Sequence, residues 1–198
     1  MDDTITDLPA GFKGIEKATK YIDFDQESDS LLGSLLSTLA ASRPHGNLLE
    51  LGTGSGLSAS WILHGMDSKS KLRTIDTDGD LVAIAKKYLA ADSRVEFNIG
   101  QGEELILSIE PESIDFIFAD AWPGKYTHIE ETLLLLRHGG IYLVDDMLPR
   151  DSWPEGHSDK ANKLVQYLEN RKDIILTKLC WSTGIIICTK QISVNGEI

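Results

Sequence analysis

Seven short apolar segments, rich in β-branched residues, alternate along this chain with segments of helical periodicity. In chain order they read NLLEL, KLRTI, RVEFN, IDFIFAD, GIYLVDD, IILTKLC and GIIICTK. Such alternation is typical of βαβ units in a parallel sheet. Only WST separates the last two segments, which is too short for a crossover helix and predicts an antiparallel hairpin. We therefore expect an α/β fold with a doubly wound, mostly parallel, seven-stranded Rossmann-like sheet and a C-terminal antiparallel hairpin.

The helical segments predict a single domain, residues 1–198, in which residues 1–46 form a helical cap on an α/β core of residues 47–198. The cap is expected to contain an amphipathic helix, because leucines recur there at helical spacing: Leu32, Leu35, Leu36 and Leu39. Farther along, Thr127 and Glu130 have the spacing of a capping box, which predicts that Thr127 caps the helix that follows.

Charge and cysteine content argue against several classes of protein. A net charge of −12 disfavours nucleic-acid binding, which depends on Lys and Arg contacts to phosphates. The apolar stretches fall short of the ~18 residues of a membrane span, and no secretory signal is recognisable, so no membrane association is expected. Cys180 and Cys188 lack metal-ligand spacing. They are expected to be buried small hydrophobic residues in a cytoplasmic protein.

A glycine-rich turn follows the first predicted strand. Its sequence is ELGTGSG, and we expect its residues Gly52, Thr53, Gly54 and Gly56 to contact a cofactor. The third glycine arrives one residue too early for the dinucleotide fingerprint, which argues against NAD. Glu50 precedes the turn, where it would repel a pyrophosphate and attract the amino and sulfonium groups of S-adenosylmethionine. The turn therefore favours a cationic cofactor.

Polar residues after the next two strands extend this predicted cofactor site. Asp76 ends the second strand about 20 residues beyond the turn, where a carboxylate accepts both ribose hydroxyls, and Thr77 follows it. Gly102 and Glu103 follow the third strand, where an adenine ring would lie. Glu103 has an alternative interpretation, as an acid that complements the dipole of the next helix.

Three more acids gather at the ends of the fourth and fifth predicted strands: Asp120, Asp145 and Asp146. Carboxylates that lie close together repel one another unless a positive charge neutralises them. A hard divalent cation such as Mg²⁺ binds carboxylate oxygens and would provide that charge. Alternatively, the acids bind only backbone groups or the cofactor.

At this point a family resemblance is evident in ELGTGSG, TIDTD, IDFIFADAWPGKY and LLRHGGIYLVDDM. Over roughly residues 30–190, the chain resembles the bacterial members of the catechol-type and caffeoyl-CoA-type O-methyltransferases, which are class I S-adenosylmethionine-dependent methyltransferases. The resemblance implies methyl transfer to an oxygen of a small molecule, and a homodimer is plausible for the family. It also implies a divalent metal at Asp120, Asp145 and Asp146, although the family usually has Asn at the last position.

The catalytic residues are less clear, because Pro123 stands where the resemblance places a lysine. Lys125 could supply the same charge from the same loop, and His157 could act as the base. With Asp120, these are the predicted catalytic residues. Trp122 is expected to line the cofactor and acceptor site as an aromatic wall.

Two alternative functions remain open. One is N-methylation of a small molecule; methylation of nucleobases or protein amides is disfavoured, because the chain reads DAWPGKY where those enzymes carry a Pro-Pro segment. The other is an S-adenosylmethionine-binding module without catalytic activity, which Pro123 supports and the three aspartates oppose. Aminopropyl transfer shares this fold and requires an acidic polyamine pocket, for which the aspartates are the only feature in the sequence.

Overall fold

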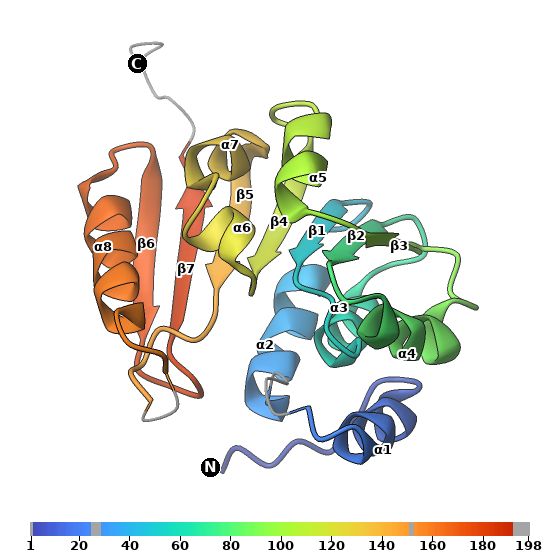
Figure 1. Cartoon of the computed structure of the whole chain (residues 1–198). Helices are drawn as coiled ribbons and strands as arrows, with labels where there is room; N and C mark the ends of the chain where they lie inside the picture. The colour runs from blue at the N-terminus through green and yellow to red at the C-terminus, as the bar shows by residue number, and fades with distance from the viewer. Residues whose placement is uncertain (1, 25–28, 151–152, 192–198) are drawn as a thin grey trace.

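The computed structural model describes residues 2–24, 29–150 and 153–191. Within these residues seven strands form one sheet, in the order β3-β2-β1-β4-β5-β7-β6 (Figure 1). The strands are β1 (Asn47–Leu51), β2 (Lys71–Asp76), β3 (Val95–Ile99), β4 (Ile114–Ala119), β5 (Leu136–Val144), β6 (Ile174–Leu179) and β7 (Ile185–Lys190). The predicted α/β fold is confirmed.

The directions of the strands also agree with the prediction. Strands β1 to β5 run parallel to one another, whereas β7 is antiparallel to both β5 and β6. Because the connection between β6 and β7 is so short, the chain returns directly as a hairpin. The hairpin then inserts β7 beside β5, with Val144 opposite Ile186, so that the turn before β7 lies at the edge where β4 and β5 end.

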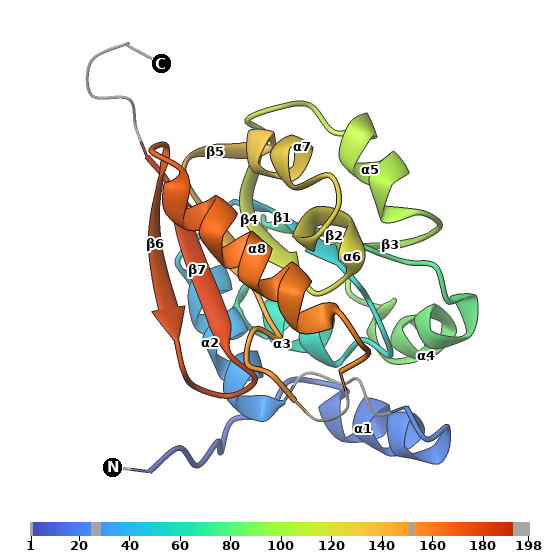
Figure 2. The ribbon, with the colours of Figure 1, turned by 60° about the vertical axis from the view of Figure 1, so that its left-hand side comes forward.

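Helices cover both faces of the sheet. One face carries α1 (Phe12–Tyr21), α2 (Ser30–Ala41), α3 (Leu57–Gly65) and α4 (Gly79–Leu89). The other face carries α5 (Gly102–Ser108), α7 (Ile129–Leu134) and α8 (His157–Asn170), and Figure 2 shows these helices in front of the sheet with α2 and α3 behind. A four-residue segment, α6 (Trp122–Lys125), follows β4, and its two central residues have non-helical backbone angles.

The central strand β4 shows why the sheet is buried on both faces. Phe116 and Phe118 belong to the core under α2 and α3, whereas Ile117 and Ala119 belong to the core under α5, α7 and α8. All four are fully buried. Successive side chains of a strand point to opposite faces, so a near-continuous apolar run is what a doubly covered parallel sheet requires.

The N-terminal helices pack closely against this core. Leu32 and Leu36 of α2 share one apolar cluster with Trp61 of α3. The two helices meet at Gly65, where a Cβ atom would lie only 2.0 Å from the backbone oxygen of Ser37. Glycine therefore permits the close approach of α2 and α3.

The predicted capping role of Thr127 is wrong. The residue that precedes α7 is His128, in the left-handed region with a φ of 54°, and no side chain caps the helix. The hydroxyl of Thr127 instead lies 3.4 Å from the backbone oxygen of Trp122. The helix ends at Leu134, and Leu136 already pairs with Ile114 as the first residue of β5.

Two further expectations concern the cysteines and membrane association. Cys188 is buried as expected, but Cys180 is exposed, because it lies just beyond the end of β6. Across the three described ranges, every helix is too short or too polar to cross a membrane.

Candidate active site

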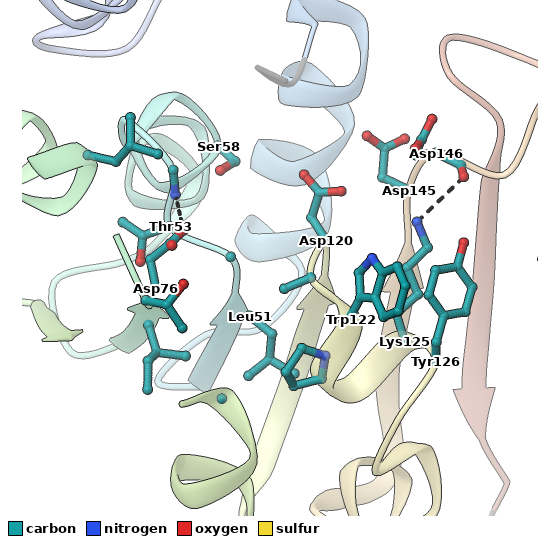
Figure 3. A pocket seen from close by; sticks show the side chains of 18 of the residues that line it. Leu51, Thr53, Ser58, Asp76, Asp120, Trp122, Lys125, Tyr126, Asp145 and Asp146 are labelled. Atoms are coloured by element: carbon teal, nitrogen blue, oxygen red, sulfur yellow. Dashed lines mark hydrogen bonds between the residues drawn. The ribbon is translucent and has the colours of Figure 1, made fainter. Parts of the chain in front are cut away.

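A cleft of about 580 Å³ opens at the carboxyl ends of the parallel strands (Figure 3). This volume lies within the ~300–1,000 Å³ of small-molecule and cofactor sites, and such sites in open α/β sheets lie at this edge. Most of the predicted cofactor residues line the cleft: Gly52, Thr53, Gly54, Asp76, Thr77, Gly102, Asp120 and Trp122. All three predicted catalytic residues line it too: Asp120, Lys125 and His157.

The glycine turn and Asp76 form one side of the cleft. The backbone N–H of Gly54 donates to Asp76 Oδ2 at 2.8 Å, and the N–H of Asp78 donates to Asp76 Oδ1 at 3.0 Å. Each carboxylate oxygen has a second lone pair, so Asp76 keeps two acceptor positions. Gly100 lines the same region, with no atom within 4 Å of the position that a Cβ would take. These residues fit a ribose and the groups attached to it.

Glu50 does not line the cleft, contrary to the expectation that it contacts the cofactor. Its side chain is fully buried, and it accepts a hydrogen bond of 2.5 Å from the hydroxyl of Thr74. The Thr74 hydroxyl in turn lies 2.6 Å from that of Thr53 in the glycine turn. Burial raises the pKa of Glu50 to about 7, partly offset by the Thr74 hydrogen bond. Glu50 therefore supports the turn from behind.

This burial predicts a pH-dependent stability. Because the pKa of Glu50 rises from 4.5 to about 7 on folding, its contribution is fully present below pH 4.5 and is lost as the pH rises through 7. At ~1.4 kcal/mol per pKa unit, the loss amounts to about 3 kcal/mol. We expect the free energy of unfolding of wild type, relative to Glu50→Gln, to fall by about that amount between pH 4.5 and 8. Urea titrations would measure it, and parallel curves for the two proteins would contradict it.

Gly56 and Glu103 do not line the cleft either. A Cβ on Gly56 would lie 2.7 Å from the Cβ of Ala85, so this glycine lets the start of α3 approach α4. Glu103 lies in the first turn of α5, which agrees with its alternative interpretation as an acid near the positive end of the helix dipole.

Helix α1 braces the glycine turn. The hydroxyl of Thr19 is fully buried and lies 2.7 Å from the hydroxyl of Ser55 and 2.8 Å from the backbone oxygen of Ile15. Ser55 itself lines the cleft. A helix that is distant in sequence therefore helps to position the turn.

Replacing Thr19 by valine tests that contact. The change keeps the shape of the side chain but leaves the Ser55 hydroxyl without this partner, which costs ~1–3 kcal/mol when the group is buried. We expect several-fold weaker S-adenosylhomocysteine binding and a lower melting temperature. Thr38→Val is the matched control, because Thr38 also donates to a backbone oxygen four residues back, that of Ser34, but is far from the turn. Equal effects on cofactor affinity in both variants would contradict the bracing role.

On the other side of the cleft Lys125 lies near the three aspartates. In Figure 3 the carboxyl groups of Asp120, Asp145 and Asp146 lie on the same side of the Lys125 side chain as its ammonium end. Lys125 is only 4% exposed, and its Nζ lies 3.5 Å from the backbone oxygen of Asp146. Burial and the neighbouring Asp145 raise the pKa of Asp120 well above its usual value, while Lys125 opposes the shift. Burial lowers the pKa of Lys125, against the pull of the carboxylates.

The position of Lys125 depends on a tight turn. Pro123 has φ and ψ of −63° and 130°, and Gly124 has 83° and −13°, which are the values of a type II turn. The hydroxyl of Tyr142 donates to the backbone oxygen of Gly124 at 2.6 Å and ties the turn to β5. The turn directs the chain back toward the sheet, so Lys125 points into the cleft. In the sequence it lies two positions after Pro123, where the family lysine was expected.

The predicted metal site is not supported by this arrangement. Within the described ranges, no group of three or more His, Cys, Asp and Glu side chains is placed so that it could hold a metal ion. Thr183 donates to Asp145 Oδ1, Arg150 forms an ion pair with Asp146, and Trp153 Nε1 lies 3.1 Å from Asp146 Oδ2. The carboxylates of Asp145 and Asp146 are thus engaged with side chains of the chain itself.

An aromatic wall closes the cleft next to these acids. His157 Nε2 lies 3.0 Å from the hydroxyl of Tyr126, and its ring lies 4.4 Å from that of Trp153 between centroids. Trp122 contacts Tyr126 edge-on, with Lys160 Nζ 3.7 Å above the indole. Burial, followed by the charge of Lys125, lowers the pKa of His157, which favours its neutral form. The wall suits a planar acceptor.

The sequence interpretation missed several residues of the cleft. Thr183 comes from the turn between β6 and β7, and Phe24 from the segment after α1. Arg150 and Trp153 belong to the loop before α8 and line the cleft as well. Thr183 reaches the cleft because β7 pairs with β5 and brings the hairpin turn to the ends of the central strands, a pairing that only the structure shows.

Comparison with known proteins agrees with this geometry. The sequence profile of an O-methyltransferase family matches residues 15–191. The chain belongs to this O-methyltransferase family.

One relative from Mycobacterium avium is 34% identical to this chain over 118 residues. Its name assigns it provisionally to the O-methyltransferases. The match covers 57% of this chain and 53% of the relative, so the chain spans about half the length of the curated relatives it matches.

Two solved structures share the fold of this O-methyltransferase-family chain. The O-methyltransferase TomG from Streptomyces achromogenes, in complex with SAM, has a TM-score of 0.82 at 21% identity, with 95% of this chain and 92% of TomG covered. An O-methyltransferase from Bacillus cereus, in complex with SAH, has a TM-score of 0.83 at 19% identity, with 96% and 94% covered.

Proposed function

We propose that this protein transfers a methyl group from S-adenosylmethionine to an oxygen of a small molecule. The observation that carries the proposal is that two chemically different groups of residues line one cleft. One side is the glycine turn with Asp76, and the other is Lys125 among the carboxylates of Asp120, Asp145 and Asp146. The first side suits a nucleoside cofactor and the second suits proton transfer from an acceptor. The names of TomG and the Bacillus cereus protein support the same cofactor and reaction.

Each side of the cleft has a defined task in this reaction. S-adenosylmethionine, when bound, supplies the reactive methyl group. Asp76 and the backbone of Gly52 to Gly54 hold the nucleoside, which fixes the position of the methyl donor. Such orientation of two reactants can contribute ~7–11 kcal/mol. The aromatic wall orients the acceptor in front of it.

The residues around Lys125 handle the acceptor proton. Asp120 lines the cleft and accepts the proton from the acceptor hydroxyl; burial and Asp145 raise its pKa, which makes its carboxylate a stronger base. The Lys125 ammonium stabilises the negative charge that develops on the oxygen. His157, bonded to Tyr126, is the second candidate base. The divalent metal that the sequence predicts is given no step, because the side chains do not fit it.

The remaining expectations belong to the proposal as well. The partner is a small molecule rather than nucleic acid or a membrane, which agrees with the net charge of −12. A cytoplasmic location and a homodimer stay predictions. N-methylation and a silent binding module are the alternatives that the following experiment separates.

The experiment is a methyl-transfer assay with matched acceptors. Wild-type protein would be incubated with tritium-labelled S-adenosylmethionine and catechol, 2-aminophenol or 1,2-diaminobenzene, and the products identified by mass spectrometry. We expect the labelled methyl group on an oxygen of catechol and of 2-aminophenol, and no label on 1,2-diaminobenzene. Label on nitrogen alone would favour N-methylation. S-adenosylhomocysteine binding without transfer to any acceptor in a broad panel would favour the silent module.

A further inference from the structure

The positive charge beside the three aspartates comes from the chain itself. The Lys125 ammonium is buried beside them, 3.5 Å from the backbone oxygen of Asp146. The Arg150 guanidinium pairs with Asp146 at the rim, where the Arg150 side chain is 45% exposed. Two cationic groups therefore face three carboxylates, and the sulfonium of a bound cofactor would add one further positive charge. This arrangement already reduces the repulsion that a metal ion would otherwise relieve.

Two of the three carboxylates also accept hydrogen bonds from neighbouring side chains. Asp145 Oδ1 accepts from the Thr183 hydroxyl. Asp146 accepts from Arg150 at Oδ1 and from Trp153 Nε1, which lies 3.2 Å from Oδ1 and 3.1 Å from Oδ2. A magnesium ion requires near-octahedral oxygen coordination and would have to displace these donors. It would also have to enter beside an ammonium group of the same sign.

The backbone holds the ammonium in this position. The type II turn at Pro123 and Gly124 directs Lys125 inward, and the Tyr142 hydroxyl fixes the turn through the Gly124 carbonyl. Gly124 lies so close to Leu51 that a Cβ would be 2.2 Å from its Cδ1 atom. The lysine is therefore built into the core side of the cleft and does not extend from a free loop.

We propose that this chain transfers the methyl group without a divalent metal, and that Lys125, assisted by Arg150, takes the place of the ion. The inference rests on the proposed function. In the transfer itself the acceptor oxygen forms a bond to the methyl carbon, the carbon–sulfur bond breaks, its electron pair stays on sulfur, and the hydroxyl proton passes to Asp120. Lys125 keeps its protons and stabilises the oxyanion by charge alone.

Manganese binding tests the inference independently of turnover. Mn²⁺ has ligand preferences similar to those of Mg²⁺, and the signal of the free ion in electron paramagnetic resonance reports binding. We expect no stoichiometric binding by wild type below millimolar Mn²⁺. The Lys125→Met variant should bind Mn²⁺ at least tenfold more tightly than wild type, because the carboxylates then lack their buried cation. The Arg150→Ala variant should also gain affinity for Mn²⁺, and it does so without a change in the core. Lys163→Met, on the exposed face of α8, is the matched control and should behave like wild type.

Turnover provides the second readout. Wild-type methyl transfer should be the same with EDTA and with added Mg²⁺, to within a factor of two. Micromolar Mn²⁺ binding by wild type, loss of activity in EDTA that Mg²⁺ restores, or no gain in Mn²⁺ affinity in either variant would overturn the inference. Failure of the proposed function is distinguishable, because it would appear as absent S-adenosylhomocysteine binding in wild type, whatever the metal content.

Discussion

Replacement of Asp76 by alanine is expected to weaken S-adenosylhomocysteine binding by at least about 100-fold. The carboxylate has one lone pair left on each oxygen after its bonds to Gly54 and Asp78. Two hydrogen bonds from ribose hydroxyls to a charged acceptor contribute ~1.5–3 kcal/mol each, and each ~1.4 kcal/mol is tenfold in affinity. The alanine also removes the acceptor that holds the Gly54 N–H in the turn. Isothermal titration of the two proteins measures the effect.

Two variants make this result specific. Asp76→Asn keeps one side-chain oxygen and should lose less affinity than the alanine variant. Asp80→Ala removes an exposed acid from the first turn of α4, outside the cleft, and should bind like wild type. If Asp76→Ala bound within threefold of wild type, the ribose would not lie at this carboxylate.

Replacement of Gly124 by alanine is expected to destabilise the protein by about 2 to 5 kcal/mol. The residue has a φ of 83°, and a left-handed conformation costs a non-glycine residue ~1–2 kcal/mol. Its Cβ would also lie 2.2 Å from Leu51 Cδ1 and 3.2 Å from Thr132 Oγ1, and overpacking of this kind costs ~1–3 kcal/mol. Relief of the clash would move the turn and with it Lys125, so kcat should fall as well. Urea unfolding and steady-state kinetics would report the two effects.

Gly139 provides the matched control for this change. Its φ of 77° is similar, but no atom lies within 4 Å of the position that its Cβ would take. Gly139→Ala should therefore cost only the ~1–2 kcal/mol of backbone strain and leave kcat unchanged. Equal destabilisation of the two variants would show that Gly124 has no close contact with Leu51 and that the turn is not packed as described.

Features encoded in short stretches of sequence could be predicted. The strand, glycine turn and helix start around Gly52 and Gly54 follow one another directly, and Asp76 ends the adjacent strand, so their meeting follows from parallel pairing of β1 and β2. The hairpin could be predicted because three residues cannot form a crossover. The sequence WPGK also contains the Pro-Gly pair of a type II turn. The direction of the Lys125 side chain, however, does not follow from the motif.

Features that depend on register or on side-chain direction could not be predicted. Glu50 lies near a strand end beside the site, but only the structure shows that its side chain is buried against Thr74 and does not line the cleft. Thr183 reaches Asp145 because Val144 pairs with Ile186, a register that no local motif specifies. The contact between Thr19 and Ser55 joins residues 36 positions apart. In each case tertiary packing decides the outcome.

Titration of the wild-type protein with S-adenosylhomocysteine, in the presence of EDTA and again with Mg²⁺, tests the central claim most directly. The cleft at the ends of the parallel strands predicts one binding site per chain, with a micromolar dissociation constant that is the same under both conditions. No binding at millimolar ligand under either condition would contradict the claim that this cleft holds S-adenosylmethionine.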